Sequence, residues 1–488
     1  MPKRSVPQQR EARKKEEQSQ AALRELSRRL TEESMGERPF YIRSVSVRGN
    51  SATRLDVIER ELAAALEAET FQDVLSALAE AEARLACMDL FESIDIYCDV
   101  AMGDRGRAQA TDITITVEER NRLTARTGTT VDVNDGNVIA SAILRNVWGG
   151  GERIEVDWST GTRVTSYYRA AYIKPNLSNL GEESSFSVFK NNTDYSVVSS
   201  HNQQEQGFSL QYAFPTPYFD HILGYTGVWR EVWALPSTAS FAVRSHAGHS
   251  VKSAFTHVAR MERRDDPVLP RSGYALELAQ EFAGLGGDAA FVKHEAKAAA
   301  SAMLGRGWSI TGLVAGGLVL PLTAAPLSAV DAFYLGGSMD VRGFRTFGIG
   351  PHAPRKITPR TALPLAAQDT VHTDAIGGDV YWKAAVHLYK RLHSTWGIYA
   401  QTFVNAGSLL STSGSPGAAG DGTSLSTSAS RALRPSDLIS STRVAIGAGL
   451  AFRTAIGLIE LNYTYPIRFF AGDRTRSGLQ FGIGLQVF

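Results

Sequence analysis

From about residue 121 to the last residue, the sequence is a series of short segments in which every second residue is apolar. In residues 443–452, for example, five apolar residues alternate with one arginine and four alanines or glycines. Segments of about ten residues with one apolar face fit tilted strands that cross a bilayer, whereas the strands of a soluble sandwich average five or six residues. Because a bilayer offers no water to unpaired backbone groups, such strands must close into a barrel. The pattern favours a membrane barrel over a soluble sandwich.

Sixteen segments of this kind follow one another, which predicts an all-β transmembrane barrel of about sixteen antiparallel strands over residues 121–488. Two long insertions interrupt the series. Residues 406–440 are rich in serine, glycine and alanine and read as a mobile external loop, whereas residues 331–374 contain an ordered-looking stretch. The predicted strands begin near residues 123, 138, 152, 163, 184, 206, 221, 249, 273, 289, 307, 375, 395, 441, 455 and 478.

One apolar stretch, from Trp308 to Val330, carries no charged residue and is long enough for a transmembrane helix. Pro321 and Pro326, together with several glycines, break the helical pattern repeatedly. We therefore expect a strand followed by a loop here.

The residues before the barrel divide into two parts. Residues 1–39 form a charged, flexible tail, and residues 40–120 read as strand, helix, helix, strand, strand, a small α+β domain. Thr53 and Thr70 are the predicted N-caps of its two helices. Its two cysteines, Cys87 and Cys98, are expected to be free, with a disulfide as the alternative.

Composition and motifs argue against several functions. The 51 basic residues nearly balance the 50 acidic ones, so no basic stripe exists to attract nucleic acid. No phosphate-binding loop, dinucleotide motif, metal-binding motif or nucleophile elbow occurs, so we expect no enzyme activity, no cofactor and no metal. The tail lacks the apolar run of a secretory signal and contains the acidic residues that mitochondrial presequences avoid.

Within the insertion at residues 331–374, Val341-Arg342-Gly343-Phe344 resembles the signature of the superfamily that inserts outer-membrane β-barrels. Members of that superfamily pair polypeptide-transport-associated (POTRA) domains with a sixteen-stranded barrel. Other parts of the chain resemble further stretches of the same superfamily in the same order. They are residues 146–152, 266–273, 286–288, 376–382 and the terminal 480–488.

Within this superfamily, a chain with a single POTRA-like module and no secretion signal resembles the barrel subunit of the mitochondrial sorting and assembly machinery. This resemblance implies a multi-pass barrel in the mitochondrial outer membrane, with the N-terminal domain toward the intermembrane space. The implied partners are β-barrel precursors such as porin and the import-pore barrel, accessory subunits of the machinery, and membrane lipid. A passive or protein-translocating pore, as in plastid or bacterial relatives, is the alternative.

The resemblance also implies that the 331–374 loop enters the lumen with Arg342 pointing inward. A buried guanidinium needs a carboxylate or carbonyl partner. Glu460 and Asp379 lie on the polar face of their strands and are the candidate partners; the alternative is a solvated Arg342 in an external loop.

The first and last barrel strands are the candidate site of activity, because only the edge between them can open cheaply. An open edge would template a substrate strand by β-augmentation. Interior glycines weaken a strand, although they also make room for large neighbours. The candidate gate residues are Leu123, Gly128, Val131 and Val133 on the first strand, and Gly478, Gln480, Gly482, Gly484, Leu485, Val487 and Phe488 on the last.

Overall fold

The chain forms two compact units in the computed structural model. The first contains the α+β module together with residues 144–153, and the second contains the other described residues that follow position 123. The described residues are 40–68, 70–100, 109–132, 135–161, 164–176, 181–233, 235–323, 327–338, 340–356, 373–393, 397–412, 435–454 and 457–484. The predicted 1–39 tail lies outside them.

The module of the first unit has the order that the sequence predicts. Its elements are β1 (Phe40–Arg48), α2 (Leu55–Leu66), α3 (Phe71–Cys87), β2 (Phe91–Val100) and β3 (Gln109–Glu119). In the sheet, β3 lies in the middle, parallel to β1 and antiparallel to β2. The two helices bury one apolar face each against the sheet, with Ile58, Leu62, Val74 and Leu85 in the core beside Ile115.

The two predicted helix caps turn out differently. The hydroxyl of Thr70 accepts a hydrogen bond from the Asp73 backbone N–H at 3.2 Å, as expected of an N-cap. The prediction for Thr53 is wrong, because α2 starts after Arg54 and has no side-chain cap. The Thr53 hydroxyl instead accepts a hydrogen bond from Asn146 Nδ2 at 2.8 Å. Cys87 and Cys98 are both free.

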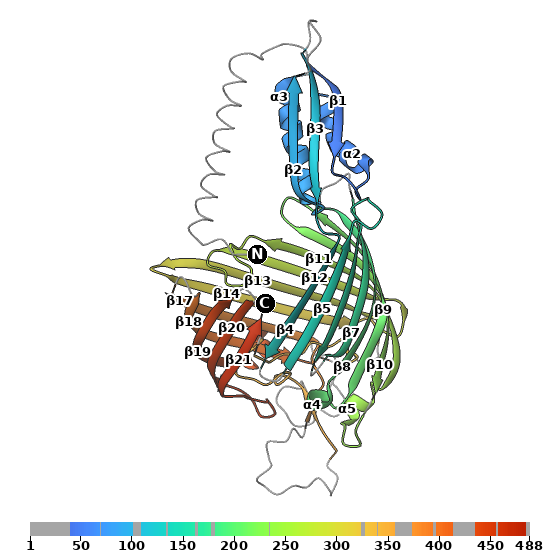
Figure 1. Ribbon diagram of the computed structural model, residues 1–488. Coiled ribbons are helices and arrows are strands. Elements are labelled where there is room, and N and C mark those ends of the chain that lie inside the picture. Colours follow the sequence, from blue (N-terminus) through green and yellow to red (C-terminus); the bar gives the residue numbers. More distant parts are fainter. Residues whose placement is uncertain are drawn as a thin grey trace. The chain divides into compact units, whose positions relative to one another are not determined.

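The second unit contains one large, barrel-like sheet of sixteen strands, which confirms the predicted number (Figure 1). Each strand begins within five residues of its predicted start. The strands are β4 (Leu123–Asp132), β5 (Asp135–Arg145), β6 (Arg153–Gly161), β7 (Val164–Pro175), β8 (Glu183–Asp194), β9 (Asn202–Pro215), β10 (Asp220–Trp233), β11 (Gly248–Glu262), β12 (Gly273–Gly287), β13 (Phe291–Gly305), β14 (Trp308–Pro321), β17 (Val380–His393), β18 (Ile398–Leu410), β19 (Arg443–Thr454), β20 (Gly457–Arg468) and β21 (Gly478–Gly484).

The two faces of this sheet have the polarity of a membrane barrel. Along β20, the outward-facing Leu461, Tyr463 and Tyr465 are 43%, 56% and 57% exposed. The residues that alternate with them, Glu460, Asn462 and Thr464, are buried on the inner face. A sheet with apolar side chains on its outer face and polar side chains on its inner face suits a lipid environment better than water.

The apolar stretch from Trp308 forms β14 as far as Pro321 and then leaves the sheet, as predicted. None of the helices in the described part of the chain is both long enough and apolar enough to cross a membrane.

Short elements lie in the connections between strands. The 331–374 loop, called the signature loop below, contains β15 (His352–Pro354) and leads into β16 (Thr373–Ala375), with which β15 pairs. The helices α4 (Ser196–Ser199) and α5 (Phe241–Arg244) lie in two other connections. The prediction of a mobile loop over 406–440 is wrong at both ends, because β18 continues to Leu410 and α6 (Pro435–Ser440) precedes β19. Residues 413–434 lie outside the described residues.

Candidate functional site

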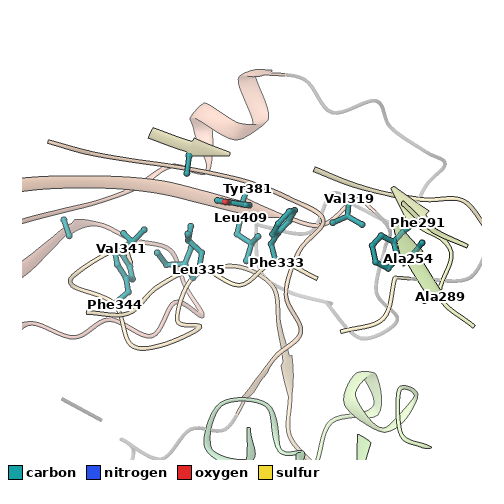
Figure 2. Packing of buried hydrophobic residues seen from close by; sticks show 14 residues of the cluster. Ala254, Ala289, Phe291, Val319, Phe333, Leu335, Val341, Phe344, Tyr381 and Leu409 are labelled. Carbon is teal, nitrogen blue, oxygen red and sulfur yellow. The ribbon is translucent and has the colours of Figure 1, made fainter. Parts of the chain in front are cut away.

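The signature loop packs against the inner face of the barrel-like sheet (Figure 2). Phe333, Leu335, Val341 and Phe344 of the loop are each no more than 7% exposed. They form one apolar cluster with inward-facing strand residues, which include Phe291, Val319, Tyr381, Leu409 and Ala445. Gly343 has a φ of 90°, and a Cβ there would lie 2.8 Å from that of Ala445, so the loop backbone approaches β19 too closely for a side chain.

The inner face also supplies the partner of the signature arginine. Arg342 Nη2 lies 2.6 Å from Glu460 Oε2 of β20, and both side chains are about 6% exposed. Arg342 Nε donates to the Ser338 carbonyl at 3.1 Å, and the guanidinium lies 4.7 Å from the ring centroid of Phe403. Asn462 Nδ2 donates to the same Glu460 oxygen at 3.0 Å. The pair is therefore buried and held from both sides.

Of the two predicted partners, the structure places only Glu460 against Arg342. The other candidate, Asp379, is not among the Arg342 contacts in the described part of the chain, so that alternative is wrong. Asp379 accepts instead from the backbone N–H of Thr412 at 2.8 and 3.0 Å, where it joins the start of β17 to the end of β18. Its position at the end of a strand favours a local backbone partner over a luminal one.

Sequence reasoning missed a second buried ion pair of the loop. Arg230 of β10 and Asp331, at the beginning of the signature loop, lie 2.7 Å apart and are 2% and 5% exposed. Lys293 of β13 donates to the Asp331 carbonyl at 3.2 Å. The alternation along β10 could have placed Arg230 on the inner face, but nothing in the sequence pairs it with Asp331. The loop is thus fixed to the sheet on two sides.

The signature loop is also hydrogen-bonded to residues 469–477, the connection between β20 and β21, which we call the terminal loop. Arg345 N donates to Arg474 O, Arg474 N to Gly348 O, and Arg476 N to Gly343 O, each at 2.8 Å. Arg476 lies two residues before the last strand. The signature loop therefore holds the segment from which β21 begins.

A third buried ion pair fixes the terminal loop itself. Arg443 of β19 and Asp473 are 0% and 1% exposed in their side chains, and form two parallel hydrogen bonds of 3.0 Å. The guanidinium also lies 4.7 Å from the ring centroid of Phe470. Such bidentate pairing defines the geometry as well as adding energy.

The edge between β4 and β21, the seam, joins the first strand of the sheet to the last. Among the described residues, Gly482 pairs with Asp132 across it, and β21 pairs with β20 on its other side. Gly482 also lies opposite Glu460 in the β20–β21 register. Glu460, which binds Arg342, is thus the neighbour on β20 of Gly482, the residue of β21 that pairs with the first strand.

The candidate gate residues fall partly within this edge. Leu123, Gly128 and Val131 belong to β4, and Gly478, Gln480, Gly482 and Gly484 belong to β21. Leu123 is 66% exposed, whereas the Gln480 side chain is buried. Val133, Leu485, Val487 and Phe488 lie outside the described residues.

The seam glycines that can be assessed do not make room for neighbours. A Cβ at Gly128 or Gly478 would meet nothing within 4 Å. In contrast, a Cβ at Gly447 would lie 2.3 Å from Phe403 Cζ, and one at Gly449 would lie 2.2 Å from Asn462 Oδ1. The packing explanation therefore applies to β19 and not to these two seam positions.

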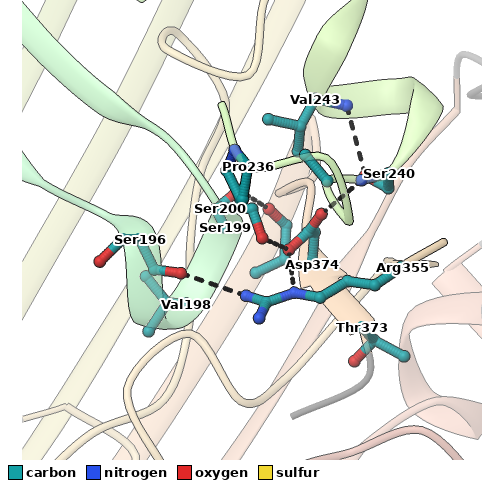
Figure 3. Close-up of polar contacts among 12 residues, drawn as sticks. Ser196, Val198, Ser199, Ser200, Pro236, Ser240, Val243, Arg355, Thr373 and Asp374 are labelled. Carbon is teal, nitrogen blue, oxygen red and sulfur yellow. Dashed lines mark hydrogen bonds and ion pairs between the residues drawn. The ribbon is translucent and has the colours of Figure 1, made fainter. Parts of the chain in front are cut away.

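A polar cluster around Asp374 joins the connections at one end of the sheet (Figure 3). The buried carboxylate accepts from Ser200 Oγ at 2.6 Å, from Ser240 N at 2.8 Å and from Arg355 Nε at 2.7 Å. Ser200 directly follows α4, Ser240 directly precedes α5, and Arg355 belongs to the signature loop. The adjacent His201 is 5% exposed, and burial lowers its pKa.

In the first unit, residues 146–152, one of the stretches that resemble the superfamily, pack on the α+β module. Asn146 Nδ2 donates to Thr53 Oγ1, and Arg54 N donates to Gly149 O at 2.9 Å. Gly149 has a φ of 84°, and a Cβ there would lie 2.8 Å from the Ala52 carbonyl. The motif thus requires glycine for close backbone approach. The residues of both units that the structure describes include no group of three or more His, Cys, Asp or Glu arranged to hold a metal.

Residues 146–487 match the family model of the Omp85 superfamily domain. The chain belongs to the Omp85 superfamily. It is 30% identical over 476 residues to the sorting and assembly machinery component 50 homolog of Homo sapiens, covering 96% of this chain and 94% of that protein. The homolog of Xenopus tropicalis is equally similar, and a SAM50-like protein of Schizosaccharomyces pombe is 29% identical over 462 residues, which cover 92% of this chain and 90% of that one. Within the superfamily, the chain belongs to the family of these component 50 homologs.

The fold resembles that of a bacterial protein of known structure. The structure of BamA from Haemophilus ducreyi lacking POTRA domains 1–3 superposes with a TM-score of 0.74 at 18% identity, covering 92% of this chain and 84% of that one. The family model and the component 50 homologs confirm the family expected from the Val341–Phe344 motif.

Proposed function

We propose that this protein inserts and assembles β-barrel precursor proteins in the mitochondrial outer membrane, as a component of a sorting and assembly machinery. Its membership of the component 50 family, with coverage of almost the full length of the relatives, supports this function. The observation that carries the mechanism is the row of contacts from Arg342 through Glu460 and Gly482 to Asp132, because it connects the signature loop to the seam.

In the proposed mechanism, the sheet is a closed barrel at rest, and the seam opens laterally. The backbone groups of β4 and β21 then become available to a substrate strand, which pairs with them by β-augmentation. Every newly added strand has its N–H and C=O groups satisfied as it enters the bilayer, so the large cost of unpaired backbone in lipid is avoided. The reaction consists of strand exchange and involves no covalent chemistry.

In this mechanism the signature loop immobilises the β21 side of the seam. The Arg342–Glu460 pair fixes β20, and the hydrogen bonds to Arg474 and Arg476 fix the beginning of β21. Across the seam, Gly482 of β21 pairs with Asp132 of β4. We infer that β4 separates from β21 while the β20–β21 hairpin stays attached to the loop.

The α+β module is proposed to be a POTRA-like domain that faces the intermembrane space and receives precursors. Its β1-β3-β2 sheet with two helices packed together supports that assignment. Porin and the import-pore barrel are the proposed substrates, and accessory subunits of the machinery the proposed partners.

The test uses the full chain reconstituted in liposomes together with urea-unfolded porin. We expect folded, protease-resistant porin to form faster in these liposomes than in empty ones. The Arg342→Ala variant should accelerate porin folding less than the unsubstituted chain does. Conductance without any acceleration of porin folding would contradict insertion and would favour a passive pore.

A further inference from the structure

Four polar side chains form a row on the outer face of the sheet, far from the seam in the strand order. His221, His257, Gln280 and His294, the polar row, come from β10, β11, β12 and β13 in turn. In the register, His257 lies opposite Gln280, and Gln280 lies opposite His294. The rings of His221 and His257 stack with Nδ1 and Nε2 3.1 Å apart.

The alternation of the strands places this row on the lipid-facing side. The neighbours Glu281 and Lys293 point inward, since Lys293 contacts the signature loop through the Asp331 carbonyl. Their chain neighbours Gln280 and His294 therefore point outward and are exposed. Phe255 and Phe282, two residues away along their strands, are 55% and 43% exposed. The polar row thus lies within an apolar band.

Polar groups at such a position are costly without hydrogen-bond partners. Gln280 and His294 form no side-chain hydrogen bond with any residue that the structure describes. Lipid tails offer neither donors nor acceptors, so an amide or imidazole facing them loses its bonds to water without replacement. Intramembrane polar residues of this kind are expected to face another protein group.

We propose that the polar row is the docking site for a membrane-spanning helix of a partner protein, one that carries hydrogen-bonding side chains one helical turn apart. A groove of about 620 Å³ lies here, lined by His257, Gln280 and His294 together with Leu223, Phe255 and Phe282. Residues i and i+4 of a helix are separated by about 6 Å along its axis, close to the roughly 4.8 Å between neighbouring strands. Two such residues would therefore meet Gln280 and His294 together.

The residues beside the row favour a helix over a second barrel. Ala296 and Ala298 continue the exposed face of β13 after His294, and small side chains allow a helix backbone to approach closely. A second copy of this chain would present a convex wall to a convex wall. The inference rests on the membrane placement of the barrel and not on its insertion activity, so failure of one leaves the other intact.

The experiment measures energy transfer in liposomes between the full chain and a designed transmembrane peptide. The peptide is a leucine–alanine helix with two asparagines at i and i+4 in its middle, and the control peptide lacks both. The chain carries a donor dye on Tyr218→Cys, with Cys87 and Cys98 changed to Ala. Tyr218 lies in the β9–β10 turn and is 72% exposed.

We expect the asparagine peptide to associate about fivefold to tenfold more strongly than the control peptide, because each hydrogen bond between membrane segments contributes modestly. The Gln280→Leu/His294→Leu variant should lose this preference. Thr402→Leu, which removes an exposed polar group from β18 instead, should keep it. Equal association of both peptides with the unsubstituted chain would overturn the proposal. A second contrary result would be that the peptide does not bind, while two copies of the chain show energy transfer that the double variant loses. That result would mean that the polar row binds another copy of the chain.

Discussion

The wall formed by β18, β19 and β20 and the seam between β4 and β21 differ in how closely side chains pack around their glycines. Glycines on the wall make room for Phe403 and Asn462, and buried ion pairs attach the wall to the signature and terminal loops. At the seam, a Cβ added at Gly128 or Gly478 would meet nothing within 4 Å. The same residue type thus makes room for neighbouring side chains in one place and lies beside open space in the other. We infer that the contacts with the signature and terminal loops keep the wall rigid, so that the strands separate at the seam and not elsewhere.

Removing the signature arginine should have the largest effect. Arg342→Ala leaves Glu460 as a buried carboxylate without its cation, which costs about 3–5 kcal/mol of unfolding free energy. The midpoint of urea unfolding in detergent measures this loss, and porin assembly measures the accompanying loss of activity. The exposed Arg345 is the matched control, because Arg345→Ala keeps the backbone hydrogen bonds to Arg474. If Arg342→Ala and Arg345→Ala lowered the unfolding midpoint and porin assembly equally, the Arg342–Glu460 pair would have no special role in holding the signature loop to the wall.

Adding one methyl group separates the two regions more finely. Gly447→Ala forces a Cβ to within 2.3 Å of Phe403, a ring that is 2% exposed, and should cost about 1–3 kcal/mol through overpacking. Gly128→Ala meets nothing and should change the unfolding free energy by less than about 1 kcal/mol, in the stabilising direction. The same unfolding measurement applies to both. A Gly128→Ala variant as damaged as Gly447→Ala would mean that the seam is packed as tightly as the wall.

Acidification should have a smaller and more local effect, confined to the cluster around Asp374. Burial lowers the pKa of His201, and that of His352, below the ordinary value of 6.5. The folded state then binds fewer protons than the unfolded state, so this stability is present above pH 6.5 and is lost as the pH falls through the lowered pKa values. The protection factors of the amides in α4 and α5, which correct exchange rates for their intrinsic pH dependence, should fall below pH 6.5, and less so in His201→Gln. Protection factors that do not change with pH would contradict this assignment.

Much of this arrangement could be predicted because alternation determines which residues face inward. The strand starts, the inner position of Glu460 and the signature loop all follow from the pattern and from one motif. The Arg443–Asp473 and Arg230–Asp331 pairs could not be predicted, because in each the aspartate lies in or next to a loop, where alternation no longer applies. The Thr53 cap failed for a related reason, since Asn146, 93 residues away, takes its hydroxyl.

The seam can be tested directly by locking it. Asp132→Cys and Gly482→Cys, in a chain with Cys87 and Cys98 changed to Ala, place two thiols at paired positions of neighbouring strands, within the usual reach of a disulfide. Tyr463→Cys with Leu479→Cys locks the paired positions of the β20–β21 hairpin instead and serves as the control. Porin assembly is then measured in liposomes before and after reduction. The account predicts that the oxidised seam variant is inactive, that reduction restores assembly, and that the control is active in both states. Normal assembly by the oxidised seam variant would contradict lateral opening.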